Sequence, residues 1–436
     1  MMEKQDNRLL YGWSVVLGCA VVCGCNIGVL SNTVGVFLKP VSMELGVSRS
    51  RIALYSSIFS MVGMFSAPFQ GRLMEKYSLK KLMVSGSVIA GLCLFCYSFA
   101  PGLWFFYVNA VLCGLVFGFT NLIPVNKILS NWFTKKKGTA VGFALAGSGL
   151  MAMVVTPVLS RMVAVYGWRI GYRFIGSLYL LLMVPVILFV IKESPEDGKL
   201  GRRITGEAEA GNNNGLVGED SAEANAAPEK RVEKRTGLTR SQAMRTRRFW
   251  LVLAALVLAS SVAMGIQQHV IAYLTDMGYG QQYASGIYSL SMGVLMAGKV
   301  ILGTLYDRLG IKGASVYICL VLAASLAFLI MADVPGAPYL FAAAFGLANA
   351  IQSIPATCLV TRFFGTREFT SIYGICNAGN MAGIALGTSM SAWIYDASGS
   401  YAAAWYFYLL LSAVIFILYM SADREYERCA LQKCCQ

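Results

Sequence analysis

Residues 13–38 read WSVVLGCAVVCGCNIGVLSNTVGVFL, a stretch of 26 residues without one charged side chain. An α-helix rises about 1.5 Å per residue, so about 20 apolar residues cross the roughly 30 Å hydrocarbon layer of a membrane. The stretch is too long for the apolar core of a secretory signal peptide, and only a short polar segment precedes it. It therefore predicts a retained membrane-spanning helix.

The rest of the chain follows the same pattern. Of its 436 residues 57% are hydrophobic and only 13% are charged, about half the charged share of a soluble domain. A β-barrel would show segments of about ten residues with alternating polarity, and none occur. The sequence therefore predicts an all-α integral membrane protein of twelve transmembrane helices. The predicted spans lie near residues 13–38, 50–70, 82–100, 103–126, 138–160, 170–191, 249–272, 283–303, 314–332, 339–361, 369–392 and 402–421.

The net charge of +14 is distributed unevenly between the connections. Of the 36 Lys and Arg residues, 28 lie in the two termini and the even-numbered connections, and six lie in the odd-numbered ones. Positive charge gathers on the cytoplasmic side of membrane proteins, so both termini and the central linker are predicted to be cytoplasmic in a multi-pass cell-membrane protein. The excess of basic over acidic residues is attributed to the membrane topology and to contact with anionic lipid headgroups, and no nucleic-acid partner is expected.

The spans divide into two sets of six. Residues 193–247 break the apolar pattern with few aromatic or β-branched side chains, which predicts a largely disordered cytoplasmic linker. The predicted domains are a six-helix bundle over residues 1–192, this linker, a second six-helix bundle over 248–422 and a cytoplasmic tail over 423–436.

The two halves also repeat one another. The segment after the second span (71–81) reads GRLMEKYSLKK, and the segment after the eighth span (303–313) reads GTLYDRLGIKG, 232 residues later. The same offset maps Gly142 onto Gly374, and an offset of 231 maps Pro124 onto Pro355. Such an internal repeat is typical of two bundles that rock about a central site.

Each repeated segment combines a glycine, an acid and several bases. Glycine allows a helix end to approach its neighbour closely, and the acid and bases can form ion pairs at the cytoplasmic rim. We therefore expect gating loops that close the cytoplasmic side and open when the bundles rock, with basic anchoring to lipid as the alternative. The gating residues are Gly71, Glu75, Lys76, Lys80, Gly303, Asp307, Arg308 and Lys312.

These segments resemble the signature loop of the major facilitator superfamily, with Glu75 in place of the usual Asp and Ser78 in place of the usual Gly. Residues 132–147, WFTKKKGTAVGFALAG, resemble the monocarboxylate-transporter pattern of an aromatic residue and Phe, a basic triplet, then Ala-x-Gly-x-Ala-x-Ala-Gly. Thr139 replaces the usual Leu. The pieces YGW (11–13) and YGWR (166–169) are similar to that family and to its bacterial oxalate/formate-antiporter relatives. The resemblance implies a major facilitator fold and transport of a small organic anion.

Lys299 is the predicted substrate-binding cation. It lies eight residues before Asp307, about 12 Å from the cytoplasmic end of its helix, whereas a lysine side chain snorkels only about 6 Å. A charge at this depth is costly without a partner or a wet cavity, and no Asp or Glu occupies a mid-helix position. The resemblance implies the same role, because relative to Gly303 this lysine takes the place of the helix-8 arginine of monocarboxylate transporters. A snorkelling or neutral lysine is the alternative.

Two further ionisable residues are candidates for a proton or anion contact. Lys127 lies five residues before Trp132, about 7.5 Å from the interface, so anchoring is as good an interpretation as substrate contact. His269, the one histidine of the sequence, lies near the outer end of its span. It could titrate near neutral pH and gate protons, although a hydrogen-bonded histidine at the interface is the favoured alternative.

Five amide side chains lie at mid-helix depth. Each must find a hydrogen-bond partner in an apolar medium, so helix packing explains any one of them alone. As a set spread over four spans, they predict that several line the substrate site. They are Asn32, Asn121, Gln352, Asn377 and Asn380.

Two runs of small residues are interpreted as packing surfaces without a substrate role. Small side chains spaced by four residues let helix backbones approach closely. The runs are Gly379, Gly383 and Gly387 in the eleventh span, and Gly138, Gly142 and Ala146 in the fifth.

Nothing in the sequence indicates an enzyme or a cofactor. It contains no phosphate-binding loop, no HExxH pair and no Cys/His metal set, so no metal is expected. The predicted function is secondary active transport, by alternating access and by a monomer, of a monocarboxylate such as lactate, pyruvate or formate. A non-transporting sensor of the same fold is the alternative from another class.

The coupling partner stays open between protons and a counter-anion. Monocarboxylate/proton symporters are expected to carry an Asp one turn before the helix-8 cation, where this chain has Leu295. Oxalate exchangers are expected to carry a second cation in helix 11, and here none follows Arg367 in that span. A single cation favours a monoanion over a dianion, and the missing acid leaves anion exchange beside proton symport.

Overall fold

The computed structural model describes residues 2–133, 137–193, 237–365 and 367–434. These residues form helices joined by short connections, and a single isolated β-bridge pairs Gly237 with Gly365. The predicted all-α membrane architecture is confirmed.

The first half contains six consecutive spans, several of them built from more than one helical segment. In chain order its elements are α1 (Met2–Cys23), η1 (Gly24–Val29), α2 (Val34–Leu45), α3 (Arg49–Lys76), α4 (Leu79–Cys96), η2 (Tyr97–Phe99), α5 (Leu103–Phe117), η3 (Gly118–Thr120), α6 (Leu122–Trp132), α7 (Lys137–Tyr166), α8 (Trp168–Pro185) and η4 (Val186–Val190).

The second half repeats this plan after a short helix. Its elements are α10 (Arg240–Met244), α11 (Arg247–Asp276), α12 (Gln281–Ile330), α13 (Ala337–Ala348), η5 (Asn349–Gln352), α14 (Ile354–Phe364), α15 (Phe369–Ser398) and α16 (Ala402–Cys434).

The number of spans is consistent with twelve. Among the described residues nine helices are long and apolar enough to cross a membrane, or ten when the bent pair α13–η5 and α14 counts as one span. The 50-residue helix α12 breaks at Gly310, whose φ of 67° and ψ of −166° suit glycine because it has no Cβ. This break divides α12 into two spans, and α15, with 30 residues, supplies one more.

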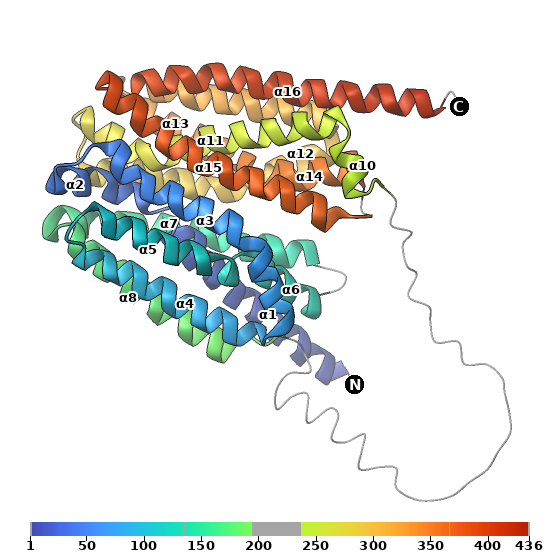
Figure 1. Ribbon diagram of the computed structural model, residues 1–436, viewed down its shortest axis with the longest axis horizontal. Helices are drawn as coiled ribbons and strands as arrows, with labels where there is room; N and C mark the ends of the chain where they lie inside the picture. The colour runs from blue at the N-terminus through green and yellow to red at the C-terminus, as the bar shows by residue number, and fades with distance from the viewer. Residues whose placement is uncertain (1, 134–136, 194–236, 366, 435–436) are drawn as a thin grey trace, which may run out of the picture.

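The two halves form two bundles that lie side by side (Figure 1). The first bundle comprises α1 to α8 and the second α11 to α16, and both chain termini lie at the same end. We call this end the terminal end; it carries the repeated segments 71–81 and 303–313. We call the opposite end the far end; it carries the connection between α2 and α3 and the connection between α11 and α12. The bundles contact each other through α3 with α15, α7 with α12, and α2 with α11.

Small residues let helices approach closely within each half. A Cβ at Gly387 would lie 2.0 Å from the Ser261 carbonyl oxygen, so α15 packs directly on α11 and the prediction for this run is confirmed. The run in α7 is different, because a Cβ at Gly142 would meet open space. The expected close packing at Gly142 is therefore wrong, and α7 contacts α1 through Gly147, where a Cβ would lie 2.1 Å from the Ala20 carbonyl oxygen.

Residues 194–236 of the predicted linker lie outside the described residues. Its last residues are helical and attached to the second half: the Thr239 hydroxyl accepts from the Gln242 N–H in a capping box, and the Leu238 N–H donates to the Phe364 carbonyl at 2.9 Å. The helix α16 continues through position 423, where the tail was expected to begin, to Cys434. The domain boundaries themselves stay a prediction.

Candidate functional site

The strongest polar contacts between the two halves lie at the far end. The Arg49 guanidinium, at the start of α3, makes a two-pronged ion pair with the Asp276 carboxylate at the end of α11, with N–O distances of 2.5 and 3.0 Å. The Lys39 ammonium binds the same carboxylate at 2.7 Å. Two cations of the first half therefore meet one acid of the second half, and the planar guanidinium fixes the geometry of the contact.

A second acid completes this cluster. The Asp396 carboxylate, near the end of α15, accepts from the backbone N–H groups of Arg49 at 3.2 Å and Ser50 at 2.8 Å. An acid at the start of a helix pairs with its unsatisfied N–H groups, so α15 caps α3 across the boundary between the halves. The guanidinium also stacks over the Tyr395 ring, 3.9 Å from its centre. We call Lys39, Arg49, Asp276, Tyr395 and Asp396 the far-end cluster.

Further hydrogen bonds join the two halves between this cluster and the middle of the molecule. The Ser57 hydroxyl donates to the Ala385 carbonyl at 2.6 Å, and the Gln268 amide donates to the Ser56 hydroxyl at 2.9 Å. On the α7–α12 side the Ser160 hydroxyl donates to the Gln281 carbonyl at 3.3 Å. The far end is therefore closed along all three pairs of contacting helices.

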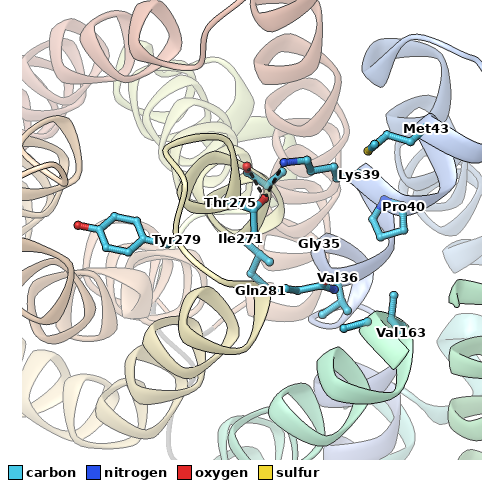
Figure 2. A pocket seen from close by; sticks show the side chains of 12 residues that line it. Gly35, Val36, Lys39, Pro40, Met43, Val163, Ile271, Thr275, Tyr279 and Gln281 are labelled. Atoms are coloured by element: carbon cyan, nitrogen blue, oxygen red, sulfur yellow. Dashed lines mark hydrogen bonds between the residues drawn. The ribbon is translucent and has the colours of Figure 1, made fainter. Parts of the chain in front are cut away.

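A pocket of about 340 Å³ opens beside the cluster. Figure 2 shows Lys39 reaching across it from α2 toward Thr275 on α11, where its ammonium donates to the Thr275 hydroxyl at 3.3 Å. The ammonium is already paired with Asp276, so the pocket presents no free cation for an anion.

At the terminal end the predicted gating residues form contacts within their own halves. The Lys80 N–H donates to the Glu193 carboxylate at 2.7 Å, and its ammonium donates to the Leu188 carbonyl at 2.7 Å. The Lys312 ammonium donates to the Glu427 carboxylate at 2.8 Å. Lys76 lies over the Tyr77 ring.

The other gating residues are unpaired or undescribed. Asp307 and Arg308 are exposed, and within the described residues neither has an ion-pair partner. The side chain of Glu75 lies outside the described residues. A Cβ at Gly71 or Gly303 would meet nothing within 4 Å, so the close approach expected at these glycines is absent from this structure.

Buried amide side chains from both halves meet midway between the ends. The Gln267 amide on α11 donates to the Asn32 side-chain oxygen at 2.9 Å, and its own oxygen accepts from the Asn349 amide at 2.9 Å. The Gln352 amide donates to the Asn349 oxygen at 2.5 Å, and the Gln352 carbonyl accepts from the Asn380 amide at 3.3 Å. We call these five residues the amide network.

The network brings together part of the predicted set and adds two residues to it, while its role in substrate binding stays a prediction. Asn32, Gln352 and Asn380 come together as expected, whereas Asn121 and Asn377 have no side-chain hydrogen bond within the described residues. Gln267 and Asn349 were missed by the sequence analysis. A signal for them existed: Gln267 begins a polar pair inside the apolar stretch 249–274, and Asn349 lies three residues before Gln352.

Two spans break at equivalent positions beside this region. The fourth span changes from α5 through η3 to α6 at Asn121, and the tenth changes from α13 through η5 to α14 at Ser353, with a bend of 41°. Pro124 and Pro355 follow the two breaks at the same repeat offset. Paired interruptions in the two halves of a transporter mark the substrate region, because the freed backbone groups can line a cavity there.

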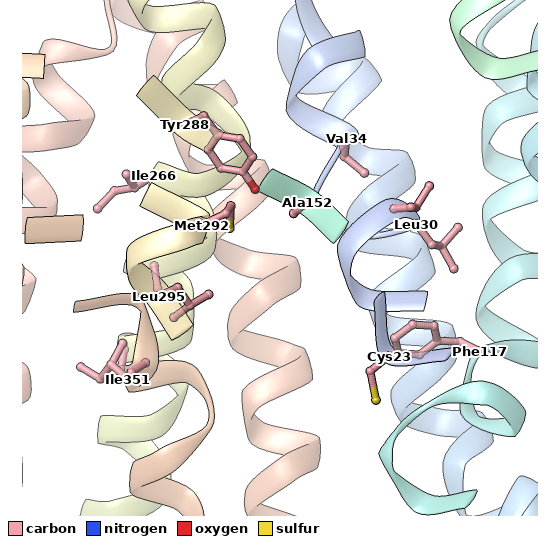
Figure 3. Close-up of a cluster of buried hydrophobic side chains, with 14 of the residues drawn as sticks. Cys23, Leu30, Val34, Phe117, Ala152, Ile266, Tyr288, Met292, Leu295 and Ile351 are labelled. Carbon is pink, nitrogen blue, oxygen red and sulfur yellow. The ribbon is translucent and has the colours of Figure 1, made fainter. Parts of the chain in front are cut away.

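Lys299 faces the other half of the molecule. It lies on α12, is only partly exposed, and shares a helical face with Met292 and Leu295, seven and four residues earlier. Within the described residues Lys299 has no hydrogen bond and no ion pair. Figure 3 shows Met292 and Leu295 of α12 on one side and Cys23 and Leu30 of the first half on the other, so this face of α12 looks toward the first span.

The two other ionisable candidates are occupied by contacts within one half. The Lys127 ammonium donates to the Met74 carbonyl at 3.4 Å. His269 is fully buried, with one ring nitrogen 3.0 Å from the Tyr401 hydroxyl and the other 2.9 Å from the Thr388 carbonyl. Both nitrogens are satisfied by a neutral ring that donates to the carbonyl and accepts from the hydroxyl, which favours a packing role for this histidine.

Comparison with known proteins decides the family. The model of the Major Facilitator Superfamily matches residues 19–348. The chain belongs to the major facilitator superfamily. Solved structures of this superfamily agree: a bacterial homologue of the human lysosomal transporter Spinster aligns with a TM-score of 0.72 over 96% of this chain and 98% of that one, at 13% identity. The nucleoside transporter NupG aligns with a TM-score of 0.70 over 94% of this chain and 99% of that one, at 15% identity.

The curated relatives of this superfamily member are monocarboxylate transporters. Monocarboxylate transporter 12-B of Danio rerio is 23% identical over 453 residues, which cover 98% of this chain and 91% of that protein. Monocarboxylate transporter 1 of Rattus norvegicus is 28% identical over 171 residues, 39% of this chain and 34% of that protein. The predicted resemblance is confirmed, and the relatives place this major facilitator protein among small-molecule transporters of membranes.

Proposed function

We propose that this major facilitator protein is a secondary transporter of a small organic monoanion, with a monocarboxylate such as lactate, pyruvate or formate as the substrate class. The substrate would bind between the halves and be exposed to one side of the membrane at a time. The monocarboxylate-transporter relatives support the class of substrate, and their low identity to this chain leaves the substrate itself to experiment.

One observation carries the proposal: Lys299 lies on the face of α12 that looks toward the first half and has no acidic partner among the described residues. An ammonium at this depth without a counter-ion is costly in an apolar medium, and a substrate carboxylate would supply the missing charge. A single cation matches a single negative charge, so a monoanion fits this site better than a dianion.

The amide network supports the same site. Met292, which accepts a weak hydrogen bond from the Asn32 amide at 3.8 Å, lies seven residues before Lys299 on α12. Seven residues are about two helical turns, so both side chains lie on one face, about 10 Å apart along the axis. The network therefore supports a site with the cation at one end and hydrogen-bonding amides at the other.

The closed far end supports an assignment of the side of the membrane to which the described state is open. Hydrogen bonds and ion pairs join the halves at the far end and at mid-depth, and those described for the terminal-end loops stay within each half. We infer that the terminal end is cytoplasmic, from the excess of Lys and Arg there, and that the structure is in an inward-facing state.

The proposal is tested by uptake of labelled lactate, formate and oxalate into proteoliposomes, for wild type and Lys299→Ala. We expect saturable uptake of a monocarboxylate by wild type and a loss of at least about 100-fold in Lys299→Ala, in line with the removal of a buried charge contact. Exposed Arg161, at the far end, provides a control in Arg161→Gln, which also removes one positive charge. Normal uptake by Lys299→Ala would refute the cation site.

Anion exchange is a second candidate because Leu295 stands one turn before Lys299, where a proton-carrying acid would be placed. Preloading the vesicles with unlabelled carboxylate separates the two mechanisms. Stimulation by internal substrate without an effect of a pH gradient supports exchange, and stimulation by an inward pH gradient supports proton symport.

A further inference from the structure

The Gln267 side chain hydrogen-bonds both to the first half and to the broken tenth span of the second half. It is 4% exposed, and its amide makes three hydrogen bonds. The N–H side donates to Asn32 of the first half at 2.9 Å. The oxygen accepts from Asn349 at 2.9 Å and from Gln352 at 3.5 Å, both of which belong to η5 in the second half.

The carbonyl and the side chain of Asn32 both bond to the opposite half. Its backbone carbonyl accepts from the Tyr288 hydroxyl at 2.9 Å, and its amide N–H points at the Met292 sulfur at 3.8 Å. A thioether is a weak acceptor, so the strong polar partner of the Asn32 side chain is Gln267. The Asn32–Gln267 bond is therefore a contact that must break if the halves separate at the far end.

The position of this bond relative to Lys299 gives it a role in the transport path. The first span and the first part of α12 run in opposite directions, since the first span ends and α12 begins at the far end. Lys299 comes after Met292, which Asn32 contacts, so it lies nearer the terminal end. The Asn32–Gln267 bond consequently lies on the far side of Lys299. In the described state it forms the wall that closes the site toward the far end.

Separation of the halves would change the two sides of Gln267 unequally. Its oxygen stays fixed by Asn349 and Gln352, which move with it in the second half. Its N–H loses Asn32 and points, already oriented, into the space between the halves. A buried donor without an acceptor is unfavourable, and a carboxylate is a strong acceptor.

We propose that Gln267 is a state-dependent substrate ligand, bound to Asn32 when the far end is closed and to the substrate carboxylate when the far end is open. This inference rests on the proposed function and deepens it, because it assigns a separate hydrogen-bond donor to substrate that enters from the far side. Lys299 supplies charge in both states, whereas Gln267 acts in one.

The test compares half-saturation concentrations on the two sides, in right-side-out and inside-out membrane vesicles. The probe is whichever of labelled lactate, formate or oxalate gives the largest wild-type uptake. Gln267→Leu is expected to raise the half-saturation concentration about 10-fold from the far side, the typical effect of one lost hydrogen bond to a charged group, and by less than about two-fold from the terminal side. Asn32→Ala frees the Gln267 N–H and is expected to lower the far-side value.

Gln268→Leu is the matched control. Gln268 is equally buried and also donates across the boundary, to Ser56, but it takes no part in the amide network. Its loss weakens far-end closure without removing the proposed ligand, so it should not raise the far-side value. Gln267→Asn keeps an amide and provides a second variant if Gln267→Leu does not fold.

Equal changes on both sides in Gln267→Leu, no change on either side, or the same far-side increase in Gln268→Leu would each overturn the inference. These outcomes are independent of the proposed cation site, which fails only if Lys299→Ala transports normally.

Discussion

At the far end the two halves share ion pairs and helix caps, whereas in the described part of the terminal end each half pairs its charged side chains internally. Asp276 binds two cations of the opposite half, but the Lys80 ammonium binds the Leu188 carbonyl and the Lys312 ammonium binds the Glu427 carboxylate, each within its own half. Both ends contain the same kinds of residues. What differs is whether the partner of a charged side chain comes from the opposite half or from its own half.

This difference shows that the charged loops of a repeat do not by themselves define a closed gate. The segments 71–81 and 303–313 carry the repeated pattern, yet the bonds that hold the bundles together come from residues outside the repeat. A transporter that alternates between two states needs a closed end and an open end at any one time. The far-end cluster is the closed end here.

The largest effect is expected from breaking the Arg49–Asp276 pair. The two side chains are 10% and 25% exposed, so the pair is partly buried and Arg49→Ala should weaken far-end closure by about 1–3 kcal/mol. We expect a cysteine placed at Ser57, which is buried beneath the cluster, to react faster with a membrane-impermeant thiol reagent added on the far side. The matching protein without that cysteine corrects for native thiols.

Exchanging the two charges distinguishes loss of the Arg49–Asp276 ion pair from general destabilisation of the protein. Arg49→Asp combined with Asp276→Arg restores an ion pair across the boundary and should slow the reaction again, at least in part. If the exchanged pair labels as fast as the single variants, or if Arg49→Ala labels no faster than wild type, the cluster does not close the far end.

A smaller effect is expected from two glycines of the second half with different surroundings. A Cβ at Gly387 would lie 2.0 Å from the Ser261 carbonyl oxygen, whereas one at Gly303 would meet nothing within 4 Å. Gly387→Ala should therefore lower stability by about 1–2 kcal/mol, seen as a drop of several degrees in the melting temperature in detergent. Gly303→Ala should melt like wild type. Equal melting of the two variants would show that this packing difference is absent.

The smallest effect is expected at the terminal end itself. Lys312 and Glu427 are 55% and 51% exposed, and an exposed ion pair contributes about 0–1 kcal/mol. Lys312→Ala should leave both the melting temperature and the labelling at Ser57 unchanged. A large change in either measurement would mean that this pair is coupled to the gate.

Much of the fold follows from the sequence because the membrane constrains it strongly. Uncharged stretches such as residues 13–38 have few alternatives to a spanning helix, and the repeat at offset 232 indicates two equivalent bundles. Which glycines pack against a neighbouring helix was harder to predict from the sequence. Gly387 and Gly142 look alike in sequence, but only Gly387 meets a neighbouring backbone, since the direction of each helix face depends on contacts distant in sequence.

The candidate site was predicted in part for the same reason. Lys299 stood out because a deep charge is rare, and Asn32, Gln352 and Asn380 because amides are unusual at mid-depth. Gln267 and Arg49 gave a weaker signal: an amide near the end of a span and an arginine at a helix start are both ordinary there. Their importance comes from partners about 230 residues away, which only the packed structure shows.

Equilibrium binding of labelled monocarboxylate to the purified protein tests the central claim most directly, because it separates the site from the motion of the halves. The account predicts saturable binding by wild type and by Arg161→Gln, and a dissociation constant at least about tenfold higher in Lys299→Gln. Binding of the anion by Lys299→Gln with wild-type affinity would contradict a carboxylate site at this lysine.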